Sequence, residues 1–123
     1  MSTLSVSNIS DNTTTVATGY VVNGSAKAWV NFNSTGTIAT RDSFNVSSLT
    51  DNGTGNYDVN FSSDMANEDY SAAGVCGTVS IASGFVTDLG DRTASVFGVT
   101  PRTASASAFD FTRVGCTIHG DLA

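Results

Sequence analysis

The side chains with the clearest capacity for chemistry are two carboxylates on a predicted turn. Asp88 and Asp91 flank a glycine in the segment TDLGDRT, from Thr87 to Thr93. Paired carboxylates can hydrolyse glycosidic bonds, one acting as the acid and the other as the base or nucleophile. Aspartates on turns, however, commonly hydrogen-bond to their own backbone. We therefore expect solvated turn residues here, with glycan cleavage as the alternative.

Other catalytic signatures are missing from the sequence. The only histidine is His119, which we expect to be solvated or satisfied, with a pH-sensitive contact as the alternative. The chain has no G-x-S-x-G motif, no H-E-x-x-H motif and no phosphate-binding glycine loop. The sequence therefore predicts no catalytic residue, no cofactor and no enzyme activity.

Two of the four arginines fall in predicted turns, where a side chain can reach outward to a carboxylate or a sugar. With the paired carboxylates they give four candidate ligand-binding residues: Asp88, Asp91, Arg92 and Arg102. We expect the other two arginines, Arg41 and Arg113, to form ion pairs within the fold, with Asp42 or Asp110 as partner.

The sequence contains only weak indications of a metal site or a disulfide. The segment DNGTGN, from Asp51 to Asn56, resembles a calcium loop but lacks the alternating acids and the closing glutamate. Two cysteines and one histidine cannot complete a structural zinc site, so we expect no metal. Cys76 and Cys116 lie in runs that alternate apolar residues, so we expect both to be small buried side chains of the core. A disulfide between neighbouring strands is the alternative, and the sequence leaves the redox state open.

The composition indicates one all-β domain. The 123 residues include 40% hydrophobic and 13% charged side chains, 12 glycines and one proline. Ser, Thr and Asn are abundant and disfavour helix interiors. Eleven acidic and five basic residues give a net charge of −6, which opposes binding to nucleic acid or anionic lipid. No apolar run approaches the ~20 residues of a membrane span, so we expect no membrane insertion.

The domain begins in the segment AKAWVNFN, from Ala26 to Asn33. Ala28, Val30 and Phe32 alternate with polar residues and the single tryptophan, so a strand would put Trp29 on the face opposite the aliphatic side chains. Another sheet, another subunit or a ligand must cover such a tryptophan. We expect packing inside the sandwich or a subunit contact rather than a ligand platform.

The clearest hairpin spans residues 44–61. Its tip at Asp51–Gly55 holds two glycines, which supply the positive φ of tight turns. Tyr57 and Phe61 follow on one face with strict alternation, and a break in the alternation at Ser47–Leu49 predicts a bulge. Our candidates for core packing or a trimer contact are Trp29, Phe32, Tyr57 and Phe61.

Shorter signals complete the domain. Residues 62–68 predict one helical turn, and Thr100–Thr103, which holds the only proline, predicts a turn. Further strands are expected at residues 37–41, 70–77, 78–86, 94–99, 107–114 and 116–119. Together these signals predict an all-β fold, an antiparallel β-sandwich of about six to eight strands.

The segment before the domain is different in character. Residues 1–24 hold scattered apolar side chains that cannot build a core, although Leu4 and Val6 allow a short strand. We assign residues 1–24 to an extended N-terminal attachment arm and residues 25–123 to the β-sandwich domain. The N-terminus lacks the basic and apolar regions of a secretory signal, which favours synthesis in a cytoplasm.

Residues 26–61, AKAWVNFNSTGTIATRDSFNVSSLTDNGTGNYDVNF, resemble a segment that recurs in phage tail-fibre and related virion structural proteins, particularly of marine and cyanobacterial phages. The departures are mild: Ser34 stands where glycine is usual, and Asn56 and Asp58 flank the tyrosine. The C-terminal run VGCTIHGD is similar to the closing strand of that family. Residues 62–106 match weakly, so the resemblance carries no ligand specificity. The stretch NYDVNFSSDMANEDYSAAG is faintly similar to H-type lectin domains, an analogy at the level of the fold alone.

The resemblance implies a virion protein that is assembled in the host cytoplasm as a homotrimer. Residues 1–24 would attach it to other virion proteins, and the β-domain would present loops to a host-surface glycan. The alternative within the virion is a capsid decoration or head-fibre protein with no receptor role. A free sugar-binding lectin is the alternative outside it.

Overall fold

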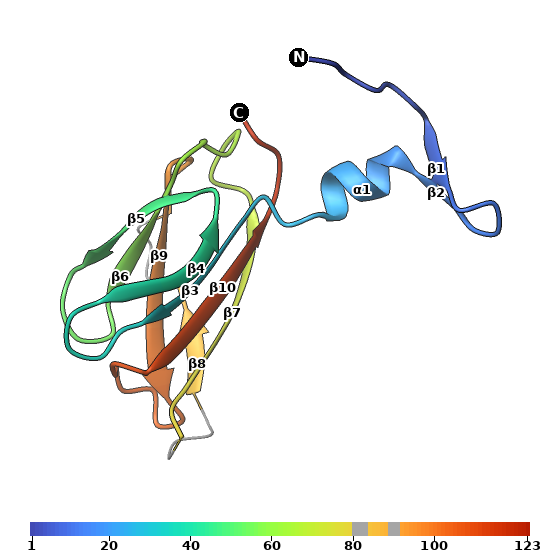
Figure 1. Cartoon of the computed structure of the whole chain (residues 1–123). Coiled ribbons are helices and arrows are strands. Elements are labelled where there is room, and N and C mark those ends of the chain that lie inside the picture. Colours follow the sequence, from blue (N-terminus) through green and yellow to red (C-terminus); the bar gives the residue numbers. More distant parts are fainter. Residues whose placement is uncertain (80–83, 89–91) are drawn as a thin grey trace.

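Two four-stranded antiparallel sheets enclose one core in the computed structural model, which describes residues 1–79, 84–88 and 92–123 (Figure 1). The strand orders are β4-β3-β10-β7 and β5-β6-β9-β8. The first sheet contains β3 (Ala28–Asn33), β4 (Ala39–Phe44), β7 (Ser71–Gly77) and β10 (Arg113–His119). The second contains β5 (Val46–Asp51), β6 (Tyr57–Phe61), β8 (Gly84–Thr87) and β9 (Val96–Thr103). The predicted β-sandwich is therefore confirmed.

Period-two alternation builds the core. In β3, Ala28, Val30 and Phe32 are buried while Asn31 is exposed, and β6 and β10 alternate in the same way. The rings of Phe32 and Tyr57 meet edge to face, with centroids 5.6 Å apart, and so join the two sheets. The core consists of Ala28, Val30, Phe32, Tyr57, Val59, Phe61, Met65, Tyr70, Phe97, Val99, Phe111, Val114, Cys116 and Ile118.

One residue carries the chain from the first sheet to the second. β4 ends at Phe44, β5 begins at Val46, and Asn45 between them has a φ of 55°. Asparagine tolerates this left-handed conformation better than most residues. Its side chain also accepts a hydrogen bond from the Ser63 amide at 2.7 Å and donates to the Ser63 carbonyl at 3.0 Å. The start of the predicted hairpin at residue 44 is therefore a sharp corner between two strands of different sheets.

The β5–β6 hairpin and its bulge are confirmed. The two strands pair antiparallel, and the register shifts between Val46 and Ser48. Gly53 and Gly55 at the tip have φ values of 119° and 61°. A Cβ on Gly55 would lie 2.6 Å from the Phe109 amide nitrogen, so only glycine fits this close approach.

Several boundaries differ from the predictions. Residues 62–68 form bends rather than a helical turn, and Met65 makes an isolated bridge with Leu122. Pro101 lies inside β9 rather than in a turn. It falls two residues beyond Val99, where the pairing with β6 ends, so its missing N–H interrupts no bond of that ladder. Residues 107–112 are irregular, and part of the predicted strand 78–86 lies outside the described residues.

A polar cluster, buried at Ser34 and half-buried at Asp110, connects three loops at one end of the sandwich. The Asp110 carboxylate accepts hydrogen bonds from the Gly55 amide at 2.7 Å and from the Tyr57 hydroxyl. The Ser34 hydroxyl and the Phe111 backbone exchange two hydrogen bonds of 2.8 Å each. Burial and the neighbouring Asp110 raise the pKa of Tyr57 to about 12. Asp110 therefore stabilises the fold by holding the tip of the β5–β6 hairpin against the loop at residues 107–112.

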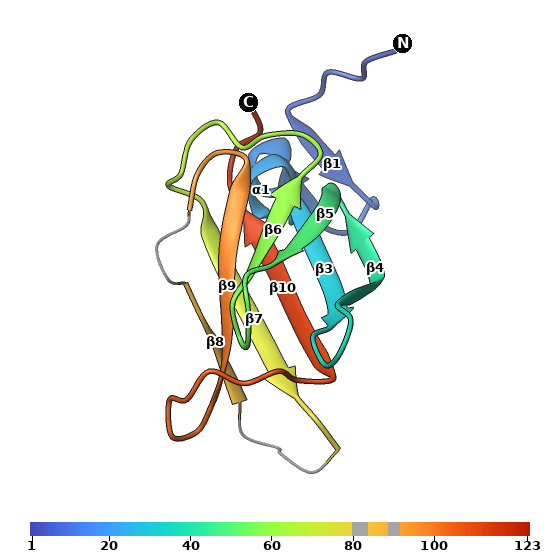
Figure 2. The ribbon, with the colours of Figure 1, turned by 90° about the vertical axis from the view of Figure 1, so that its left-hand side faces the viewer.

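The N-terminal arm has more structure than the sequence indicates. It contains a short hairpin, β1 (Asn8–Ser10) and β2 (Thr15–Ala17), followed by helix α1 (Thr18–Gly24). The short strand that Leu4 and Val6 allow does not form, and the first strand begins at Asn8. The arm projects away from the sandwich in Figure 1 and lies behind it in Figure 2, on the side of sheet β4-β3-β10-β7. Among the described residues, no helix is long and apolar enough to span a bilayer.

Candidate functional site

The outer face of sheet β4-β3-β10-β7 is the first candidate surface. Because the register is fixed across all four strands, the outward side chains fall into rows. One row runs through Phe44, Trp29, Thr117 and Ala73. The next row runs through Asp42, Asn31, Gly115 and Val75. Phe44 and Val75 are 55% and 73% exposed, so large apolar side chains on this face lie uncovered within one chain.

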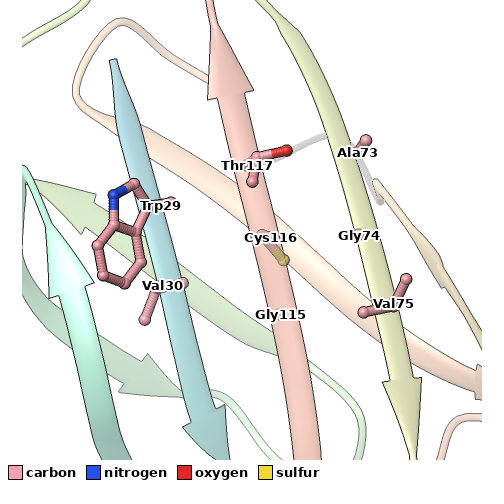
Figure 3. A pocket seen from close by; sticks show the side chains of 8 residues that line it. All are labelled: Trp29, Val30, Ala73, Gly74, Val75, Gly115, Cys116 and Thr117. Carbon is pink, nitrogen blue, oxygen red and sulfur yellow. The ribbon is translucent and has the colours of Figure 1, made fainter. Parts of the chain in front are cut away.

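A hollow of about 320 Å³ lies on this face between β3 and β7 (Figure 3). Trp29 forms one wall, Val75 forms the opposite wall, and Gly115 lies between them. A Cβ added to Gly115 would meet its nearest neighbour, a Val75 methyl, at 3.7 Å. The glycine therefore keeps the hollow open without being required by the packing beneath it.

A second hollow of about 380 Å³ adjoins the first along β10. Gly115 and Val75 line both hollows, while Asn31 and Arg113 line only the second. Trp29 pairs with Thr117, which lies four residues from Arg113, a span of about 13 Å at the rise of a strand. The two hollows form one shallow groove, apolar at the tryptophan end and polar at the arginine end.

The groove carries positive charge in an acidic protein. Arg41 donates to the Asn31 side-chain oxygen at 3.3 Å and to the Thr112 carbonyl. Arg113 is exposed at the polar end. In the described part of the chain, the one ion pair joins two other residues, so the pairing that we expected for Arg41 and Arg113 is wrong. Among the described residues, the guanidinium groups of Arg41 and Arg113 lie beside the groove without a carboxylate partner.

The structure describes three of the four predicted ligand-binding residues, and these three bond to their own chain. Asp91 lies outside the described residues, and Asp88 accepts an ion-paired hydrogen bond from Arg92 at 2.8 Å. The Arg92 guanidinium also donates to the Tyr70 carbonyl at 2.6 Å and lies 4.8 Å from the centroid of the Tyr70 ring. Arg102 lies in β9 rather than in a turn. Both arginines bind their own chain instead of reaching outward.

The candidates for core or trimer packing divide into two groups. Phe32, Tyr57 and Phe61 are at most 6% exposed in a single chain, so they are unavailable for a subunit contact. Trp29 is half-buried on the outer face, and the expectation that it packs inside the sandwich is wrong. A subunit contact or a ligand at Trp29 stays a prediction.

The cysteines are free thiols held by the fold. Cys116 is buried, and burial raises its pKa to about 12. Cys76 is half-buried and donates a weak hydrogen bond to the Phe85 carbonyl at 3.3 Å. Burial raises its pKa as well. Among the described residues, no group of three or more histidine, cysteine or carboxylate side chains could hold a metal ion.

The N-terminal arm is the second candidate surface, because its apolar side chains are uncovered. No residue of α1 is buried, and Tyr20 and Val22 are 76% and 58% exposed. The exposed large apolar residues of the arm are Met1, Leu4, Val6, Ile9, Val16, Tyr20, Val21 and Val22. Strands of three residues and a helix of seven are marginal in water without tertiary contacts. Within one chain, the apolar side chains of the arm therefore lie uncovered on short elements.

Two parts of these surfaces are difficult to find from sequence. Arg113 falls near the end of the predicted strand 107–114, where alternation would put it on the face of Phe109 and Phe111. Residues 107–112 are irregular instead, and β10 begins at Arg113 and places it on the outer face. Arg41 reaches the outer face through Asn31, next to a bulge in the β3–β4 pairing that no sequence signal marks.

Comparisons with known proteins leave the chain without an assigned relative. No protein-family model, no curated protein and no solved structure matches it.

Proposed function

We propose that the chain is a structural protein of a phage virion, an appendage that attaches through residues 1–24 and displays its β-sandwich. The observation that carries this proposal is the arm, which has regular secondary structure but no buried residue. The resemblance of residues 26–61 to tail-fibre proteins supports the virion and a trimeric assembly. The displayed domain would contact a host-surface glycan.

The chemistry of the arm supports an assembly role. Residues 2–24 contain one charged side chain, that of Asp11. The helix sequence TGYVVNG contains none. Covering the arm with protein would therefore bury apolar surface while desolvating little charge, which favours association. The core of the sandwich contains no residue of the arm, so the arm is not needed to complete that core.

The arm also gives the homotrimer a physical basis. Phe32, Tyr57 and Phe61 are enclosed within one chain, so contacts between copies must use other residues. Three arms that pack side by side would cover Tyr20 and Val22 and leave the sandwiches separate. The same bundle of arms would provide one attachment point for the particle.

The test uses particles that lack the protein and purified chains that are added back. We expect the full chain to attach and a chain lacking residues 1–24 to attach at least tenfold less. A Tyr20→Ser/Val22→Ser variant should fail in the same way, because it removes the apolar surface of α1. The matched control is Asn23→Ser, an exposed polar position of the same helix, which should attach normally.

Equal attachment with and without residues 1–24 would contradict the role of the arm in attachment. Gold labelling of the attached subunit distinguishes a tail appendage from a capsid decoration or head-fibre protein, because these place the label on the tail or on the head.

A further inference from the structure

The groove along β10 combines an aromatic wall, neutral polar groups and positive charge. The Trp29 ring lies at its apolar end, with Thr117 directly across on β10. Asn31 and Arg113 lie at its polar end. Mostly apolar walls with a few placed polar groups are typical of small-molecule sites. The apolar faces of sugar rings stack on an indole, and their hydroxyl groups suit amide and hydroxyl partners.

The charge of the groove differs from the charge of the whole protein. The chain has 11 acidic and five basic side chains. Arg113 lines the polar end of the groove, and Arg41 donates a hydrogen bond to Asn31 beside it, while Asp42 on β4 is the one acidic residue of the two outward rows. Neither arginine forms an ion pair within the described part of the chain. Guanidinium groups match carboxylate and sulfate groups, so the groove is complementary to an anion.

We propose that this groove binds an acidic oligosaccharide that lies along β10. One sugar ring stacks on Trp29, and a carboxylate or sulfate of another ring pairs with Arg113. The span of about 13 Å between the two ends exceeds one sugar ring, so the ligand is a chain rather than a monosaccharide. This inference rests on the proposed display function and names the class of glycan that the displayed domain would contact.

A second copy of the chain fits the same face less well. Two such faces packed against each other would bring Arg41 and Arg113 of both copies into a dry interface, where each copy supplies one carboxylate, that of Asp42, for two guanidinium groups. Burying unpaired charge is costly. An oligosaccharide in a shallow groove leaves the guanidinium groups at its edge partly solvated. The charge pattern therefore favours the sugar.

The test exploits the single tryptophan, whose fluorescence reports directly on the groove. The probes are a hexagalacturonate, a sulfated carrageenan hexasaccharide and the fully methyl-esterified hexagalacturonate. The ester keeps the sugar backbone and removes the charge. We expect at least one acidic probe to change the fluorescence of the full chain with saturation, and the ester to bind at least tenfold more weakly.

Three variants locate the binding. Arg113→Gln should weaken the acidic probe about tenfold, because it removes one charge-assisted interaction. Gly115→Ala fills the groove without a clash, so it should weaken binding while leaving thermal stability unchanged or higher. Arg102→Gln removes the same charge from β9 in the other sheet and should leave the affinity unchanged.

Defined results would overturn the inference. The inference is overturned if neither acidic probe binds, or if the acid and the ester bind equally well. It is also overturned if Arg113→Gln and Arg102→Gln lose the same affinity. A change in native mass caused by Gly115→Ala would place a second copy on this face instead. Each of these results leaves the arm test unaffected, so the failure of the groove is distinguishable from the failure of the proposed function.

Discussion

Replacing Phe32 with alanine should destabilise the protein by about 3–5 kcal/mol, the usual range for a large aromatic ring in a core. Phe32 is fully buried in the central strand β3, and its ring contacts Tyr57 across the sandwich. Because small domains have a total stability of about 5–15 kcal/mol, this one change removes a large share of it. Chemical denaturation at pH 7 measures the effect as a lower midpoint with the same slope.

The matched control for this prediction is Phe44→Ala. Phe44 lies in the neighbouring strand β4 of the same sheet but is 55% exposed. Its replacement should cost no more than about 1 kcal/mol, since little buried contact is lost. Similar losses at Phe32 and Phe44 would contradict the assignment of the inner and outer faces of the sheet.

Alkaline pH should unfold the protein between about pH 9 and pH 12. Burial raises the pKa of Tyr57 from 10.0 to about 12, and the bonded Asp110 adds to the shift. Burial also raises the pKa of Tyr70 from 10.0 to about 12 and that of Cys116 from 9.0 to about 12. The unfolded chain therefore releases these protons at lower pH than the folded chain does. Stability is full below pH 9 and is lost as pH rises through 12.

Denaturation midpoints measured from pH 8 to pH 12 check this prediction. In Tyr57→Phe the decline above pH 10 should be shallower, because one of the perturbed phenols is gone. The same variant should be less stable at pH 7, since Asp110 loses the hydroxyl that donates to it. A flat profile up to pH 12 would show that these groups are not protected by the fold.

The fold was predictable where one face of a strand is buried. In β3 and β6 every second residue packs into the core, so the sequence alternates and the strands can be read directly. The corner at Asn45 is hidden because Phe44 and Val46 keep the same alternation on both sides of it. Helix α1 is hidden for another reason: its two valines and two glycines are poor helix formers, so propensity gives no signal.

The candidate site was harder to predict than the fold. Arg92 and Arg102 are candidates for outward contacts in the sequence, but each donates hydrogen bonds to backbone carbonyls and side chains of its own chain. Arg41 and Arg113 were expected to pair within the fold, yet they flank the groove. Strand register decides which charges become neighbours, and a single sequence does not specify register between distant strands.

The most direct test of the central role of the arm is the native mass of the purified protein in solution. The proposal predicts that the full chain has three times the monomer mass of 12.6 kDa. It also predicts that a chain of residues 25–123 is a folded monomer, because the sandwich core is complete without the arm. A monomeric full chain, or a trimer that survives removal of residues 1–24, would contradict assembly through the arm.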